Sequence, residues 1–362
     1  MKKITSMILA LVFAVSVIGS ASAKTLKIQL TFPKTSYDGQ IVKMWTDRVT
    51  KLTRGELKFE LLSKGEVVGM KETLEAVDKG LVDGGAAWTH YWSNYHPAAM
   101  LFGSPVAGGG IGLSTKSWLA WYFDNGGKEL YDQLWSEMGM NVKGFVMASS
   151  GPEALGWFKE PIKNMDDFRK YRFRTPPGIP GQTYKDIGIA SVSLSGGDIL
   201  PALEKGTIDA AEWCCPKPDS VFGFQKVLKN YYLQGLHQNV VNGDIYINGD
   251  VYNSLTDHQK YAMEVASEAM ITRNITNRAV ENGKALIDLT QNHGVKLWDT
   301  PADYFTEYMN AAQATLKKNA ASNAFFKEVY EHMTAHAKIV VPFIAQMETS
   351  DASIGTAFAK QQ

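Results

Sequence analysis

The chain has 362 residues, in which 37 lysines and arginines balance 37 aspartates and glutamates. This balance excludes the strongly basic surface of a nucleic-acid-binding protein and gives no reason to expect an anionic membrane as a partner. A chain of this length can bury large cores and usually divides into two domains.

The N-terminal 23 residues have the pattern of a cleaved signal peptide. Lys2 and Lys3 precede an apolar stretch over residues 7–18, and small residues over 20–23 allow cleavage after position 23. The apolar stretch is shorter than the ~20 residues of a membrane-spanning helix. We therefore expect residues 1–23 to be removed and the mature chain to be exported, with two more acidic than basic residues.

Lobe I is predicted over residues 24–148. Its expected strands cover 26–30, 57–62 and 142–146, and its expected helices cover 40–52 and a segment capped by Ser114 or Thr115. Strands and helices in this order are typical of a doubly wound parallel sheet.

A short α/β unit occurs twice along the chain. Residues 74–87 (LEAVDKGLVDGGAA) and 200–213 (LPALEKGTIDAAEW) align without gaps. In each copy a short helix is predicted to end at a glycine in the left-handed conformation, with a lysine in its last turn. A buried strand is predicted to follow at once, from Leu81 in the first copy and from Thr207 in the second. The repeat indicates two similar α/β lobes.

Lobe II is predicted over residues 149–237. Strands over 171–175 and 190–194 restart the pattern there, and part of about 238–260 is expected to return to lobe I. Crossing from one lobe to the other and back is typical of a hinged, two-lobed protein.

Helices dominate the rest of the chain. Thr256 and Gln259 have capping-box spacing, and an apolar-periodic pattern then predicts one helix over 256–293, about 55 Å long and shared by both lobes. Helices over 301–319 and 322–346, the second kinked at Pro342, belong to the C-terminal region 301–362.

Several motifs that resemble catalytic or metal sites are incomplete. The glycine run 108–112 lacks the context of a dinucleotide-binding fingerprint, so we interpret it as a flexible rim. His332 and His336 are four residues apart on a predicted helix, but no third ligand accompanies them, and a solvated helix surface is the simpler interpretation. No nucleophile elbow is present. The sequence does not require an enzyme.

The two cysteines are adjacent, at Cys214 and Cys215. An exported protein can form disulfides, but neighbouring residues close one only through a strained ring. We interpret the pair as small buried thiols. A vicinal disulfide, which would stiffen the wall of the crevice, stays open as the alternative.

Charged residues stand at the ends of two predicted strands. Arg172 and Arg174 lie on one side of a strand that would normally be apolar, so each needs a partner. A structural salt bridge would account for Arg172, whereas Arg174 at the strand exit is placed to bind a ligand carboxylate as a bidentate fork. Glu212 and Trp213 end the second repeat, where strand ends face a crevice.

These residues carry a family resemblance. The chain resembles the periplasmic solute receptors of tripartite ATP-independent periplasmic (TRAP) transporters of the DctP type, within them the branch that binds 2-oxo acids and lactate. The resemblance covers essentially the whole mature chain. It implies a periplasmic-binding-protein (Venus flytrap) fold that closes on a small organic anion. The matching segments are 91–92, 153–158, 171–174, 196–213 and 222–232.

The resemblance also implies roles for particular residues. Arg174 matches the arginine that binds the ligand carboxylate. Glu153, Glu212 and Trp213 match positions that hold a bridging cation, Trp213 through its main-chain carbonyl. The family commonly has a glutamine in place of Glu153, and the additional carboxylate favours Ca²⁺ over Na⁺. A different ligand, or a site without a cation, stays open as the alternative.

The resulting hypothesis is a periplasmic receptor for a 2-oxo or 2-hydroxy monocarboxylate, such as pyruvate or lactate, that delivers it to the TRAP membrane subunits. Tyr91, Trp92 and Trp213 would enclose the apolar part of the ligand. The resemblance implies that some members of the branch dimerise through an extended C-terminal helix, and the tail here is long enough to form such a homodimer. Two alternatives stay open: an exported hydrolase or lyase acting on a carboxylate, and a ligand sensor.

Overall fold

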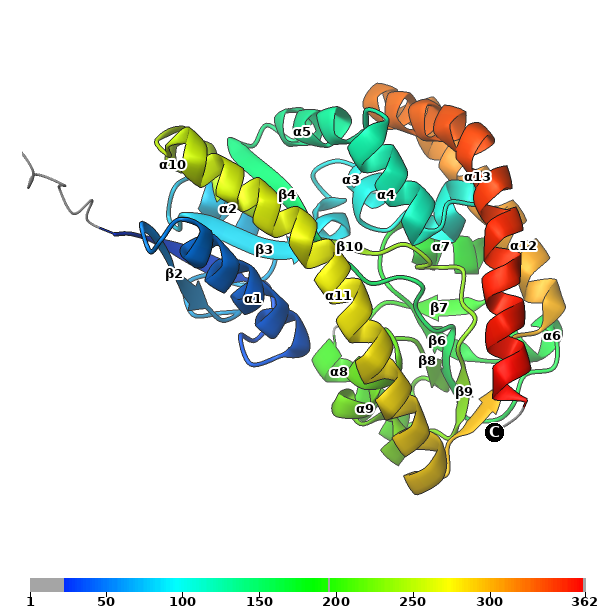
Figure 1. Cartoon of the computed structure of the whole chain (residues 1–362). Helices are drawn as coiled ribbons and strands as arrows, with labels where there is room; N and C mark the ends of the chain where they lie inside the picture. Colours follow the sequence, from blue (N-terminus) through cyan, green and yellow to red (C-terminus); the bar gives the residue numbers. More distant parts are fainter. Residues whose placement is uncertain (1–22, 195, 361–362) are drawn as a thin grey trace, which may run out of the picture.

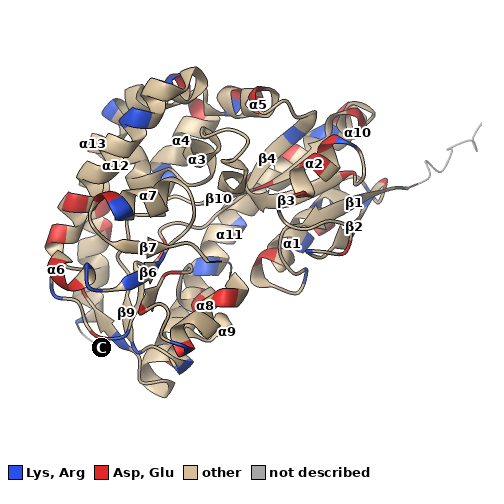
Figure 2. Ribbon diagram, turned by 180° about the vertical axis from the view of Figure 1, so that it is seen from behind, with Lys and Arg blue, Asp and Glu red and all other residues tan. Residues whose placement is uncertain are grey.

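The computed structural model describes residues 23–194 and 196–360, so the predicted signal peptide lies outside the described residues apart from its last position. The described chain forms two α/β lobes, each built on one sheet, and a long helix, α11 (Asp257–Asn292), runs along both (Figure 1). The predicted two-lobed α/β fold is confirmed. Basic and acidic residues lie among one another on both lobes (Figure 2). No described helix is long and apolar enough to cross a membrane.

Lobe I contains a five-stranded mixed sheet. Its parallel strands pair in the sense predicted, but one strand enters from after lobe II and lies antiparallel to both of its neighbours. The predicted all-parallel sheet was wrong for this reason. The strands in spatial order are β2 (Leu57–Leu62), β1 (Lys24–Leu30), β3 (Gly84–Trp88), the antiparallel β10 (Asn242–Asn248) and β4 (Val142–Ser149).

Lobe II contains a six-stranded mixed sheet. Its edge strand β11 follows α11 and was not expected from the sequence, because only three residues form it. The strands in spatial order are β11 (Lys296–Trp298), β9 (Asn230–Tyr232), β5 (Gly156–Phe158), β8 (Ala210–Ala211), β6 (Arg172–Arg174) and β7 (Ala190–Val192).

The two sheets share one topology over five strands. The series β2, β1, β3, β10, β4 corresponds to β7, β6, β8, β5, β9, and each neighbouring pair has the same parallel or antiparallel sense in both lobes. The sequence repeat therefore reflects a duplicated fold. In the ungapped repeat, Ala86 and Ala87 of lobe I correspond to Glu212 and Trp213 of lobe II.

Helices and short 3-10 turns fill the connections between strands. Ser114, rather than Thr115, caps the fourth helix, where it forms a capping box with Ser117. Lobe I has α1 (Tyr37–Leu52), α2 (Thr73–Asp78), η1 (Thr89–Trp92), α3 (Ala99–Gly103), η2 (Val106–Gly110), α4 (Thr115–Asp124), α5 (Gly127–Glu137) and α10 (Gly249–Asn253). Lobe II has α6 (Met165–Phe168), α7 (Ile179–Asp186), α8 (Gly196–Glu204), α9 (Pro216–Phe222) and η3 (Phe224–Lys226).

The two repeat helices, α2 and α8, are each followed by a left-handed glycine, as predicted: φ is 68° at Gly80 and 67° at Gly206. In both copies the next amide, that of Leu81 or Thr207, donates to a carbonyl five residues back, at 2.8 Å and 2.9 Å. Because these amides close the helix ends, the strands β3 and β8 begin a few residues later. The predicted strand starts at Leu81 and Thr207 were therefore wrong.

Helix α11 begins at the predicted capping box. The Gln259 amide donates to Thr256 Oγ1 at 3.3 Å, and the Thr256 amide donates to Gln259 Oε1 at 3.1 Å. The helix packs against α1 and β4 of lobe I and against α9 of lobe II. It therefore contacts both lobes, as predicted.

Two helices, α12 (Ala302–Ser322) and α13 (Ala324–Ala359), form the C-terminal region. Helix α12 packs against α7 and η2, and α13 packs against α4 and α5. Helix α13 continues through Pro342 and past the predicted end at residue 346. Its His332 is exposed, as predicted, but His336 is buried, with its Nε2 3.0 Å from the Ser117 carbonyl, so a solvated surface was wrong for that residue.

The glycine run was expected to form a flexible rim, and this was wrong for its first three residues. Gly108, Gly109 and Gly110 are buried. The Gly108 amide donates to Asn239 Oδ1 at 2.5 Å, and a Cβ on Gly110 would lie 2.8 Å from the side chain of Gln313 on α12. Gly110 is therefore close to α12, whereas a Cβ on Gly108 would meet the backbone of Leu113.

Candidate functional site

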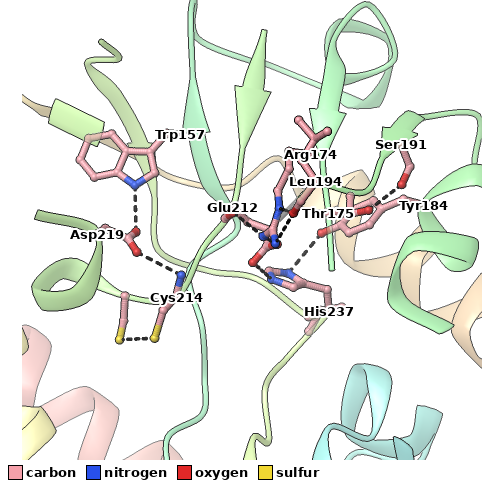
Figure 3. A network of polar contacts seen from close by, with 12 residues as sticks. Trp157, Arg174, Thr175, Tyr184, Ser191, Leu194, Glu212, Cys214, Asp219 and His237 are labelled. Atoms are coloured by element: carbon pink, nitrogen blue, oxygen red, sulfur yellow. Dashed lines mark hydrogen bonds and ion pairs between the residues drawn. The ribbon is translucent and has the colours of Figure 1, made fainter. Parts of the chain in front are cut away.

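Polar side chains meet at the ends of the lobe II strands, where the chain crosses between the lobes. Arg174 ends β6 and Glu212 follows β8, its parallel neighbour, so both lie at the same edge of the sheet. Glu153 lies between β4 and β5, and His237 lies between β9 and β10. Figure 3 shows that Arg174, Glu212 and His237 point toward one another.

The Arg174 guanidinium is buried and heavily engaged. Nη1 donates to the main-chain carbonyl of Glu212 at 2.9 Å and to its carboxylate oxygen Oε1. Nε and Nη2 donate to the Leu194 carbonyl at 3.2 Å and 3.1 Å. These contacts use four of the five N–H groups of the side chain. A bidentate grip on a ligand, as predicted from the sequence, would require Glu212 to release Arg174.

Arg172 has the structural role that the sequence allowed for it. It is exposed, and its guanidinium forms a two-pronged salt bridge with Asp209, with both contacts at 2.8 Å. The two arginines of β6 therefore differ: Arg172 is paired with Asp209 at the surface, and Arg174 lies inside the candidate site.

Glu153, Glu212 and His237 form a buried cluster. One donor atom from each lies within 4.8 Å of the other two, and their residues are 6%, 0% and 0% exposed. Glu212 Oε2 and His237 Nε2 lie 3.5 Å apart, and neither has a hydrogen-bond partner among the described residues. Burial, followed by the nearby charge of Glu212, raises the pKa of Glu153 well above its usual range. Two carboxylates with an unsatisfied buried oxygen fit a bound cation.

Tyr91 and Trp92 approach from lobe I but lie differently. Burial raises the pKa of the Tyr91 hydroxyl, and the charges of Glu153 and Arg174 act on it, which places Tyr91 in the electrostatic field of the site. Trp92 is only 1% exposed and packs edge-to-face against Tyr246 in the core of lobe I. The structure thus places Trp92 within the lobe I core.

Trp213 lies on the lobe II side. Its ring is 5.4 Å from the Arg174 guanidinium carbon and packs against Phe222 at 5.0 Å. A Cβ on Gly196 would lie 2.9 Å from the same ring, so the glycine makes room for it. The indole is therefore held over the arginine.

A buried carboxylate, Asp219, fixes the segment that follows Trp213. It accepts hydrogen bonds from Trp157 Nε1 at 2.8 Å and from the Cys214 amide at 3.0 Å (Figure 3). It also accepts one from the Tyr231 hydroxyl at 2.9 Å. Burial raises the pKa of Asp219 to about 7. Cys214 and Cys215 are free thiols in this structure, the first half-buried and the second buried.

Two histidines of the site were not predicted from the sequence. His237 contacts the Tyr184 hydroxyl through Nδ1 at 3.2 Å and turns its other ring nitrogen toward Glu212. His90 is half-buried; loss of hydration lowers its pKa to about 4, and the Glu212 charge opposes this shift. Both follow central strands of a sheet, β3 and β9, and that position is the signal that could have identified them.

Comparison with known proteins identifies the family. The chain matches the family model of the bacterial extracellular solute-binding proteins, family 7 (DctP), over residues 30–323. The monocarboxylate 2-oxoacid-binding periplasmic protein of Nostoc sp. (strain PCC 7120) is 32% identical over 298 residues, which cover 80% of this chain and 78% of that protein.

Solved structures share the fold. A TRAP transporter solute-binding protein of Bordetella bronchiseptica RB50, a dimer with copurified calcium and picolinate in one active site and an apo site, has a TM-score of 0.85 at 25% identity and covers 94% of this chain and 99% of its own. A receptor of Pseudoalteromonas atlantica T6c with bound sodium and pyruvate has a TM-score of 0.82 at 20% identity, covering 91% and 99%.

The family match spans both lobes and α11, and the Nostoc relative aligns over most of both chains. A non-catalytic binding protein was expected from the sequence, and the family consists of such proteins. The chain therefore belongs to the DctP family of TRAP transporter solute-binding proteins.

Proposed function

We propose that this protein is a periplasmic receptor that captures a small 2-oxo or 2-hydroxy monocarboxylate, such as pyruvate or lactate, together with a cation, and delivers it to TRAP membrane subunits. The observation that carries this proposal is the buried cluster of Glu153, Glu212 and His237 beside Arg174. The 2-oxoacid-binding relative and the calcium- and sodium-containing receptors support it.

Glu153 and Glu212, with the main-chain carbonyl of Trp213, would hold the cation. The cation would supply positive charge for the ligand carboxylate and its neighbouring 2-oxo or 2-hydroxy oxygen. With the charge of Glu212 neutralised in this way, Arg174 Nη1 is free to turn from Glu212 to the ligand carboxylate as a charge-assisted donor. His237, whose Nδ1 contacts the Tyr184 hydroxyl, has its Nε2 3.5 Å from Glu212 Oε2 on the other side.

Aromatic side chains would complete the binding site. Tyr91 from lobe I and Trp213 from lobe II would cover the apolar part of the ligand, and Trp92, next to Tyr91 in the sequence, lies in the core of lobe I. Excluding water lowers the local dielectric constant and strengthens the ionic contacts. Ligand would therefore stabilise the closed arrangement of the lobes through its higher affinity for that state.

The donor set favours Ca²⁺ over Na⁺. Two carboxylates in one buried cluster carry more negative charge than a monovalent ion neutralises, whereas Ca²⁺ balances both. The unpartnered oxygen of Glu212 is available for this contact.

We further propose a homodimer built on α13. Its C-terminal half exposes large apolar side chains at intervals of four or seven residues, as expected for a helix that packs against another along one stripe. The dimeric receptor from Bordetella bronchiseptica supports a second copy as the partner. The stripe consists of Ile339, Phe343, Met347, Ile354 and Phe358, which are 56–73% exposed.

A ligand screen tests the receptor proposal. The mature chain is heated with pyruvate, lactate, longer 2-oxo acids or dicarboxylates, each in Ca²⁺, in Na⁺ or in chelator. Pyruvate or lactate should raise the unfolding midpoint only with a cation present, because a ligand that binds the folded form stabilises it. Equal stabilisation in cation-free buffer, or by dicarboxylates alone, would contradict the proposal.

A reconstituted uptake assay separates transport from the sensor alternative. Proteoliposomes that hold the TRAP membrane subunits should take up labelled pyruvate only when this receptor is added. Binding without receptor-dependent uptake would favour a sensor.

A further inference from the structure

The adjacent thiols of Cys214 and Cys215 lie next to the candidate site and have no part in the proposed function. They occupy the loop between β8 and α9, and their Sγ atoms are 2.8 Å apart. The backbone of this loop is fixed on both sides: the Ala154 amide donates to the Cys214 carbonyl at 2.7 Å, and the Cys214 amide donates to Asp219 at 3.0 Å. The fold therefore holds the two sulfurs together.

Arg278 of α11 faces both sulfurs. Its Nη1 lies 3.5 Å from Cys214 Sγ and 3.6 Å from Cys215 Sγ. Its Nη2 donates to Asp38 of α1 at 2.9 Å, and the guanidinium carbon lies 4.8 Å from the ring centre of Tyr37. The thiol pair of lobe II thus shares one buried cation with lobe I. A nearby guanidinium stabilises negative charge on sulfur, and thiol–disulfide exchange requires that charge.

We propose that Cys214 and Cys215 are a redox modification site that closes to a vicinal disulfide by exchange with a disulfide oxidant. The half-buried Cys214 gives up its proton and its sulfur attacks one sulfur of the oxidant, which releases one thiol and leaves a mixed disulfide. Cys215 then gives up its proton and attacks Cys214 Sγ, which displaces the second thiol. Two protein S–H groups lose two protons and two electrons, and the oxidant is reduced to two thiols.

The two sulfurs need to move only a short distance to form the disulfide. The sulfurs must approach from 2.8 Å to the bond length of about 2.05 Å, a movement of less than one ångström between side chains that the loop already holds together. Cys214 is the residue that an external disulfide can reach, since Cys215 is only 5% exposed.

Closing the ring would affect the ligand site, a consequence that rests on the proposed function. Trp213 directly precedes Cys214, so constraining the 214–215 peptide moves the segment that offers the Trp213 carbonyl. The oxidised receptor should therefore bind pyruvate with Ca²⁺ several-fold more weakly than the reduced receptor.

Redox titration of the mature chain tests the site without any ligand. The protein is equilibrated in glutathione buffers, its free thiols are trapped by alkylation, and its intact mass is measured. Both thiols should disappear together in one two-electron transition, with the loss of two hydrogen atoms and no glutathione adduct. The matched variants Cys214→Ser and Cys215→Ser should instead keep their thiol or carry glutathione. A wild-type chain that keeps two alkylatable thiols in oxidised glutathione, or that stops at the adduct, overturns the proposal.

Calorimetry separates this inference from the proposed function. Pyruvate is titrated with Ca²⁺ into the reduced chain, the oxidised chain and the double Cys→Ser variant. The reduced chain and the double variant should bind alike, and the oxidised chain more weakly. Equal affinity in all three would overturn the coupling to the ligand site, whereas a reduced chain that binds no pyruvate would count against the proposed function alone.

Discussion

Replacing Glu153 by glutamine should stabilise the ligand-free protein and weaken its binding of Ca²⁺. The side chain is buried beside Glu212, and burial together with that neighbouring charge raises the pKa of Glu153. The folded protein therefore carries either a repulsive pair of carboxylates or a proton that must leave before a cation binds. A neutral amide of the same shape removes the repulsion and also one negative ligand.

The structure sets the size of both effects. Two carboxylate oxygens within 4.8 Å of each other repel by about 3 kcal/mol at an effective dielectric constant near 20. Protonation of Glu153 already relieves part of this, so the gain in unfolding free energy should be about 1–3 kcal/mol, a rise of a few degrees in the unfolding midpoint. Loss of a similar attraction in the Ca²⁺ complex should lower the Ca²⁺ affinity about 10- to 100-fold.

Scanning fluorimetry in chelator and calorimetric titration with Ca²⁺ and pyruvate measure the two effects on Glu153→Gln. Glu160→Gln is the matched control, since Glu160 is an exposed carboxylate of the same lobe, and it should change neither quantity. An unchanged or lower unfolding midpoint for Glu153→Gln, or a Ca²⁺ affinity within about twofold of wild type, would refute the assigned role of Glu153.

Three further predictions follow from other groups. Arg174→Lys should weaken pyruvate binding by about tenfold or more in calorimetry, because an ammonium cannot replace the planar fork; Arg172→Lys should leave it unchanged. Asp244 has a pKa raised to about 7 by burial, so the folded protein binds its proton more tightly than the unfolded chain does, and stability should fall as the pH rises from about 4 to 8. Asp244→Asn should flatten this decline in urea unfolding. Phe343→Asp with Ile354→Asp should give a monomer in light scattering, because two charges interrupt the apolar stripe of α13.

Each of these has its own contradicting result. Equal loss of pyruvate binding in the Arg174 and Arg172 variants would point to a general effect of altering β6. An unchanged pH profile in Asp244→Asn would assign the pH dependence to other buried acids such as Asp219. Ser353→Asp adds charge next to the α13 stripe and serves as the dimer control; a monomeric control, or a dimer that survives both stripe substitutions, would contradict the predicted interface.

The sequence predicted those elements that short-range chemistry determines. The capping box at Thr256 and the left-handed glycines at Gly80 and Gly206 need only neighbouring residues, and each is present in the structure. Pairing between distant segments was harder to predict: β10 enters the lobe I sheet in the antiparallel sense from after lobe II, and no local pattern encodes its direction. The buried packing of Gly110 against α12 depends on a partner about two hundred residues away.

The candidate site shows the same division. The repeat and the alternating arginines drew attention to Arg174 and Glu212, which do lie in contact. His237 was missed because its neighbours in the sequence carry no motif, and only the return crossover brings it to Glu212. The hydrogen bond from Arg174 to the Leu194 carbonyl could not be predicted either, because every residue type has the same main-chain carbonyl.

The duplicated sheets also have a kinetic consequence. Lobe I has Ala86 and Ala87 where lobe II has Glu212 and Trp213. The charged groups of the site therefore lie in lobe II and in the segments that cross between the lobes. Lobe I contributes His90 and Tyr91. A receptor of this kind can bind its anion in the open conformation and close afterwards. Stopped-flow traces should then show two phases. The rate of the first, bimolecular phase increases with ligand concentration, and the rate of the slower phase reaches a plateau at the rate of lobe closure.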